Sequence, residues 1–222
     1  MSTYLSLSSL LMVMTVLAAV YFCYERRRAA PAEIAAVATL AALAGLGRVP
    51  FAAVPGVQPT TFLVLVCSQV FGPLAGFIIG STAAFVSNFF LGHGPWTPWQ
   101  MLAWGLAGLC GGLLFQGKTP SRWLFTFVAF FWGFIFGWIL NFWHWLTFVY
   151  PLTLHSFLAT MATGIAFDFM HALSNAFFMM FLGPEVGTIL RRYKRRLSFY
   201  SLPETKQAAN NSQKAKMRRC ER

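Results

Sequence analysis

The sequence predicts an all-α integral membrane protein, a compact bundle of six core transmembrane helices with an additional span at the N-terminus. Three observations support this prediction. Of the 222 residues, 57% are hydrophobic and only 10% are charged, whereas soluble domains carry roughly 25% charged residues. The stretch from Gln58 to Gly117 contains no Lys, Arg, Asp or Glu. Most Lys and Arg residues lie between apolar segments or after the last one, as in membrane proteins that keep these residues cytoplasmic.

Each apolar segment predicts one helix, because backbone groups in lipid must be paired within the protein. The expected spans cover residues 4–24, 31–47, 60–71, 72–91, 99–116, 122–150 and 155–183. Whether residues 4–24 belong to the functional bundle stays open, so the number of spans is six or seven. The chain divides into an N-terminal span with a basic linker (1–30), the six-helix core (31–187) and a basic tail (188–222).

The basic residues also predict which ends of the helices share a side of the membrane. With Arg26–Arg28 inside, the loops 48–59, 92–98 and 151–154 fall outside, and the turn at Gly72-Pro73, the loop 117–121 and the C-terminal tail fall inside. Sixteen of the 17 Lys and Arg residues then lie on the cytoplasmic side, and Arg48 is the exception. This distribution explains the net charge of +11 through topology rather than nucleic-acid binding.

Small residues recur four positions apart in several spans, which lets helices approach closely. Examples are Gly72-Gly76-Gly80, Gly108-Gly112 and Gly133-Gly137. In the first core helix, Ala38 and Ala42 have the same spacing. This face either packs within the chain or docks onto a second membrane subunit.

No catalytic or metal-binding constellation is present: the cysteines lack metal-type spacing, and no phosphate-binding Gly loop precedes a Lys. Asp168 lies deep in an apolar span and shares a helical face with His171 and Asn175. An ionisable residue inside a span indicates a functional site by default. The alternative is an Asp168–His171 pair that only stabilises the fold.

Polar and aromatic residues gather at the predicted outer ends of the spans. Single Trp, Tyr or Arg residues there can also serve as membrane-boundary anchors. A pocket with aromatic walls and a few polar groups is nevertheless typical of ligand sites. We therefore predict an outward-facing ligand pocket formed by Arg48, Gln58, Trp96, Trp99, Gln100, Trp104, Asn141, His144, Trp145, Tyr150, His155, Asp168, His171 and Asn175.

Three segments, AAVATLAALAGLGRVPF, GPLAGFIIGSTAAF and GHGPWTPWQMLAWGLAG, resemble the substrate-binding (S) component of energy-coupling factor (ECF) transporters over residues 32–187. The resemblance implies a six-helix fold, a bacterial cell-membrane location, a ligand near the outer face, a membrane coupling subunit and two cytoplasmic ATPases as partners. Docking would use Ala38 and Ala42, although Ala32 and Ala36 share the spacing. The GPWTPWQM loop and the Trp-rich fifth core helix are most similar to cobalamin-specific members, so cobalamin is the expected ligand, with no intrinsic cofactor.

Four functions are therefore distinguished. The first is capture of a vitamin outside the cell, followed by delivery through ATP-driven reorientation in the membrane. The second is the same role for another vitamin or precursor. The third is an intramembrane enzyme with Asp168 and His171 as acid and base. The fourth is a scaffold protein without a ligand.

Overall fold

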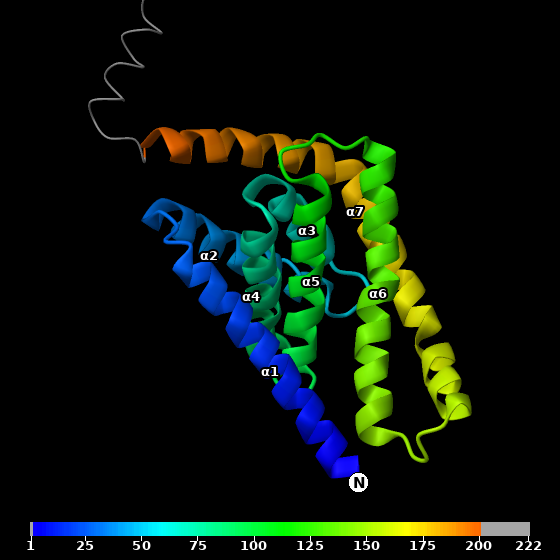
Figure 1. Ribbon diagram of the computed structural model, residues 1–222. Coiled ribbons are helices and arrows are strands. Elements are labelled where there is room, and N and C mark those ends of the chain that lie inside the picture. The colour runs from blue at the N-terminus through cyan, green and yellow to red at the C-terminus, as the bar shows by residue number, and fades with distance from the viewer. Residues whose placement is uncertain (1, 201–222) are drawn as a thin grey trace, which may run out of the picture.

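The computed structural model describes residues 2–200 and confirms the all-helical prediction. Its elements are α1 (Ser2–Arg26), α2 (Pro31–Leu46), the short 3₁₀ helix η1 (Val49–Phe51), α3 (Thr60–Phe71), α4 (Pro73–Leu91), α5 (Thr97–Phe115), α6 (Arg122–Phe148) and α7 (Leu154–Tyr200), shown in Figure 1. The predicted core is thus the six helices α2–α7, with α1 as the additional N-terminal helix.

Five of these helices are long and apolar enough to cross a membrane: α1, α2 with η1, α4, α6 and α7. Helix α3 has 12 residues, which gives a length of only about 18 Å, shorter than the ~30 Å hydrocarbon core of a bilayer. Eleven of its residues are buried. Helix α3 is therefore enclosed by the other helices, and its polar residues contact protein rather than lipid.

Glycines bring α4 and α5 into close contact, as their spacing predicts. A Cβ atom on Gly108 would overlap the backbone of Gly76, and one on Gly80 would overlap the backbone of Trp104. Gly112 approaches the α3–α4 turn in the same way. Without side chains at these positions, the two backbones pack directly against each other.

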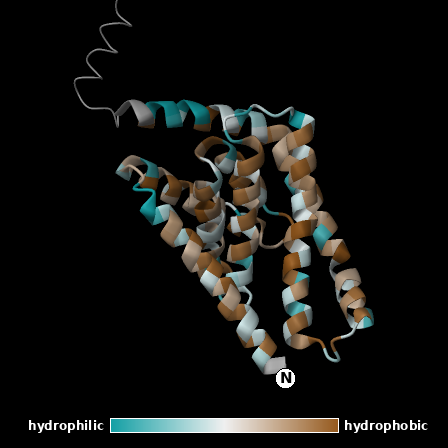
Figure 2. Cartoon of the chain, in the orientation of Figure 1, coloured by the Kyte–Doolittle hydropathy of each residue, from teal (hydrophilic) through white to brown (hydrophobic). Residues whose placement is uncertain are grey.

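The two ends of the bundle differ in polarity. In Figure 1 the described N-terminal end, the α4–α5 loop and the α6–α7 loop lie toward one end, and the α1–α2 link, the α3–α4 turn and the α5–α6 loop lie toward the other. Figure 2 shows hydrophilic residues concentrated at this second end, where the last part of α7 crosses the bundle. These six positions therefore group as the sequence predicts, whereas loop 48–59, predicted to lie with the α4–α5 and α6–α7 loops, lies midway along the bundle in Figure 1.

The last helix is longer than the sequence indicates. A span ending at Gly183 is predicted, but α7 continues through Pro184 to Tyr200. Proline removes one backbone donor and bends a membrane helix without ending it, and Figure 1 shows the final part of α7 running across the end of the bundle. Leu190 is buried there, and Val186 and Leu197 pack against the core, which stabilises the extension. Residues 201–222 of the predicted tail lie outside the described residues.

Candidate ligand-binding site

A cavity of about 440 Å³ lies between the α2–α3 loop (residues 47–59), α6 and α7, close to the adjoining ends of α4 and α5. The loop folds inward, so residues from distant parts of the sequence share one wall. Apolar lining comes from side chains such as Phe51, Phe136 and Leu140. Its polar lining side chains are Arg48, Gln58, Gln100, Asn141 and Asp168, all of them predicted site residues.

Arg48 is held in place on one wall of the cavity. One guanidinium nitrogen donates to Ser87 Oγ (2.9 Å) and to Asn88 Oδ1 (3.4 Å). The guanidinium carbon lies 4.8 Å from the centre of the Trp104 ring, a cation–π contact that stabilises a partly desolvated charge. Arg48 thus contacts protein groups instead of extending to lipid headgroups.

Asp168 carries the opposite charge on another wall and is only 2% exposed. Asn141 Nδ2 donates to Asp168 Oδ2 (3.1 Å). Gly137 makes room for this carboxylate, because a Cβ atom there would overlap it. Among residues 2–200 no hydrogen bond joins Asp168 to His171, so the alternative of an Asp168–His171 pair is wrong. The two side chains bind different partners although they share a helical face.

His171 joins α7 to the α2–α3 loop and to α3. Its Nδ1 lies 3.1 Å from the carbonyl oxygen of Gly56 and its Nε2 lies 3.1 Å from Thr61 Oγ1. A carbonyl only accepts, so Nδ1 carries the hydrogen and Nε2 accepts from Thr61. Thr61 Oγ1 in turn accepts from the indole nitrogen of Trp104 (3.0 Å). This buried chain of hydrogen bonds fixes the rear of the cavity.

The α2–α3 loop is fixed at a second point. The backbone nitrogen of Gln58 donates to Ser174 Oγ (3.0 Å). The Gln58 side-chain nitrogen also lies 3.2 Å from His171 Nδ1, but both atoms are donors in this tautomer, so they form no hydrogen bond. Gly56 has a φ of +77°, in the region that favours glycine. The loop conformation therefore depends on α7, which also supplies Asp168.

Nine of the fourteen predicted residues do not line the cavity. Trp99 is buried and Gln100 accepts from Asn88 Nδ2 (2.8 Å), whereas Trp96 is exposed. Asn175 is fully buried without a hydrogen-bond partner among the described residues. Four more belong to the ends of α6 and α7 or to the loop between them: His144, Trp145, Tyr150 and His155.

Sequence reasoning missed several residues that position this site. Ser87 and Asn88 orient Arg48, and Thr61 connects Trp104 to His171. The signal for Ser87 and Asn88 was available, since they form a polar pair inside an apolar helix. Thr61 was less visible, because threonines are common at helix starts.

Part of this chain is similar in sequence to curated proteins. UPF0397 proteins of Vibrio atlanticus and Aliivibrio fischeri are 32% identical over 109 residues and 31% identical over 94 residues, which covers 43% and 40% of this chain. The matched segments span 59% and 50% of those relatives, so the chain spans about half the length of the curated relatives it matches. No solved structure matches the chain.

A family profile covers much more of the sequence. The profile described as "ECF transporter, substrate-specific component" matches residues 32–190, which include the α2–α3 loop and all five polar residues that line the cavity. The match leaves out all of α1, in agreement with a six-helix core. The chain therefore belongs to the family of ECF transporter substrate-specific components.

Proposed function

We propose that this multi-pass membrane protein captures a vitamin in the cavity between Arg48 and Asp168 as the substrate-binding subunit of an ECF importer. The observation that carries the proposal is a cavity with opposite charges on its walls. Arg48 is hydrogen-bonded to α4, and Asp168 is hydrogen-bonded to α6. A mostly apolar cavity with a few oriented polar groups is the usual form of a small-molecule site.

The proposed transport cycle needs partners. A membrane coupling subunit would hold the ligand-loaded chain, and two cytoplasmic ATPases would supply energy, since the sequence has no phosphate-binding Gly loop followed by Lys. The basic end of the bundle would face the cytoplasm together with the C-terminus. The cavity would then open outward, and reorientation in the membrane would release the ligand inside.

Reorientation is costly for unpaired charges, at least ~2.5 kcal/mol for a charge at the bilayer centre. The two charged side chains of the cavity are each hydrogen-bonded to protein groups. These contacts support the proposal because they offset part of the cost while the bundle turns.

Two observations bear on which vitamin binds: the sequence resemblance and the volume of the cavity. The GPWTPWQM loop makes cobalamin the candidate from sequence. The cavity volume of about 440 Å³ lies toward the low end of the roughly 300–1,000 Å³ range of drug-sized sites, and a corrinoid with its nucleotide loop is larger than such ligands. The volume therefore favours a more compact vitamin or precursor, and cobalamin would require the α2–α3 loop to move outward.

Mass spectrometry of small molecules that co-purify with the protein tests the proposal. We expect one vitamin at near-stoichiometric amount, with corrinoids scored against riboflavin, thiamine, folate, pantothenate and pyridoxine. A preparation that absorbs as a corrinoid would establish the corrinoid class, and the mass would distinguish cobalamin from its precursors. Purified, folded protein that retains and binds none of these compounds would contradict vitamin capture and favour a scaffold.

A second prediction concerns the coupling subunit. Ala38 is exposed on α2 and Ala42 is partly exposed, whereas Ala36 and Ala41 on the same helix are buried. Replacing Ala38 with phenylalanine should therefore block close helix contact and prevent co-purification with the coupling subunit, because small residues are needed there. Ligand binding should remain unchanged.

The matched control for this prediction is Leu124→Phe, at an exposed position of α6. This variant should assemble normally. Normal assembly of the Ala38→Phe variant would exclude this face as the docking surface.

A further inference from the structure

A second cavity, of about 400 Å³, lies at the basic end of the bundle, opposite the proposed vitamin site. It is bounded by the end of α3, the α5–α6 loop and the part of α7 beyond Pro184. Among the residues that the structure describes, no Asp or Glu lines it, whereas its lining includes the basic residues Lys118, Arg191, Lys194 and Arg195. The vitamin-binding role does not use this cavity.

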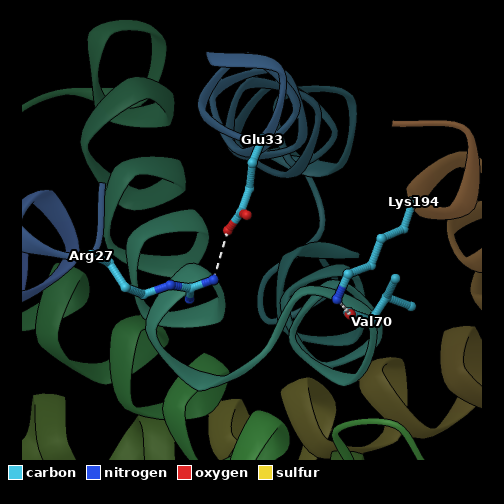
Figure 3. Close-up of polar contacts among 4 residues, drawn as sticks. All are labelled: Arg27, Glu33, Val70 and Lys194. Carbon is cyan, nitrogen blue, oxygen red and sulfur yellow. Dashed lines mark hydrogen bonds and ion pairs between the residues drawn. The ribbon is translucent and has the colours of Figure 1, made fainter. Parts of the chain in front are cut away.

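Lys194 is directed back toward the bundle. Its Nζ donates to the backbone oxygen of Val70 (2.6 Å), as Figure 3 shows, and lies 5.6 Å from the centre of the Phe71 ring. An ammonium group has three donors, so this contact leaves two for a ligand. Glu33, which Figure 3 shows in the same region, is bound by Arg27 at 3.1 Å.

Lys118 and Arg191 also make one hydrogen bond each while retaining further donors. Lys118 Nζ donates to the carbonyl oxygen of Leu114 (3.0 Å), and a guanidinium nitrogen of Arg191 donates to Thr188 Oγ1 (3.0 Å). Neither these two residues nor Lys194 forms a salt bridge within residues 2–200, although Glu33 also interacts electrostatically with Lys194. Lys118 and Arg191 therefore carry positive charges that no salt bridge of the described residues pairs.

Exposed apolar side chains lie on the α5 side of the cavity. The lining residue Lys118 contacts the backbone of Leu114, whose side chain is 50% exposed, and the adjacent Leu113 is 67% exposed. Ile189 and Tyr193 are also exposed, but helical spacing places them on the face of α7 opposite Arg191 and Lys194. A cationic cavity with exposed leucines at one side, at the end of a membrane-spanning bundle, matches a ligand with an anionic head and acyl chains. Basic pockets at the cytoplasmic side of membrane proteins bind such headgroups.

We propose that this cavity binds the phosphate of an anionic phospholipid headgroup, with Lys118, Arg191 and Lys194 as donors. The phosphate would also hold the end of α7 against the α5–α6 loop, because the basic residues come from both elements. A free phosphate ion shares the headgroup chemistry but would gain nothing from the apolar surface.

The test uses the full-length protein in detergent and measures binding of dioctanoyl phosphatidylglycerol, dioctanoyl phosphatidylcholine and inorganic phosphate, by native mass spectrometry and by the shift in melting temperature. The wild type should bind phosphatidylglycerol at least about tenfold more tightly than phosphatidylcholine, given the strength of basic clusters on anionic lipid. The variant Lys118→Gln/Arg191→Gln should lose most of this preference. It leaves Lys194 and its contact with Val70 intact.

The matched control is Arg192→Gln/Arg196→Gln, which removes two exposed charges from the same part of α7 outside the cavity lining. It should keep the preference for phosphatidylglycerol. Equal losses in both double variants would show a diffuse charge effect and overturn the proposal. Inorganic phosphate that binds as tightly as phosphatidylglycerol, or a cavity variant that loses only assembly with the coupling subunit, would also overturn it.

Discussion

Replacing Gly108 with valine is expected to remove most of the folded protein from the membrane. A Cβ atom at this position would overlap the carbonyl group of Gly76 in α4, and a backbone atom cannot move aside as a flexible side chain can. Overpacking costs typically 1–3 kcal/mol, and here we expect about 3 kcal/mol or more because α4 and α5 would have to separate. The measurement is the monodisperse yield and the melting temperature in detergent.

Leu113→Val on the same helix is the control, because Leu113 is exposed. It should express and melt like the wild type. A Gly108→Val variant with wild-type yield and melting temperature would mean that α4 and α5 do not pack through Gly76 and Gly108.

Replacing Asp168 with asparagine is expected to weaken binding of the co-purifying vitamin by roughly tenfold to a hundredfold. The change keeps the shape of the side chain and an oxygen that accepts from Asn141, but it removes the negative charge from the cavity wall. Hydrogen bonds to charged groups contribute about 1.5–3 kcal/mol, which sets this range. Isothermal titration with the vitamin identified by mass spectrometry measures the effect.

Glu185→Gln is the matched control, since Glu185 is an exposed acid on the same helix and outside the cavity lining. Its affinity should equal that of the wild type. Unchanged affinity of the Asp168→Asn variant would place the ligand elsewhere. Loss of a turnover with unchanged binding would instead support the intramembrane enzyme.

The helices could be predicted from sequence because lipid leaves the backbone few alternatives. Loops and apolar runs located α3, α4 and α6 to within a few residues. The end of α7 could not be located in this way, since a proline in a membrane helix either ends or bends it. The bend depends on burial of Leu190 against the core, which is a tertiary contact that local pattern does not contain.

The candidate site was predicted in composition more than in arrangement. Helical spacing correctly placed Asp168 and His171 on one face, but it could not show that the α2–α3 loop folds inward and binds His171 through Gly56. His144 and His155 were predicted to line the site because they lie at the outer ends of their helices. They do not line the cavity, because α6 and α7 extend past it. The inward path of the loop is a long-range contact that sequence spacing leaves undetermined.

Helix α7 is continuous from Asp168 to Lys194, so it connects the two proposed binding sites. The segment before Pro184 lines the proposed vitamin site, and the segment after Pro184 lies over the basic end. Spin labels attached at Leu158 and Ile189, which are exposed and lie one on each side of Pro184, would report the bend angle of α7 at this proline. Comparing their separation in the free and assembled protein would reveal whether transport flexes the molecule or turns it as a rigid block.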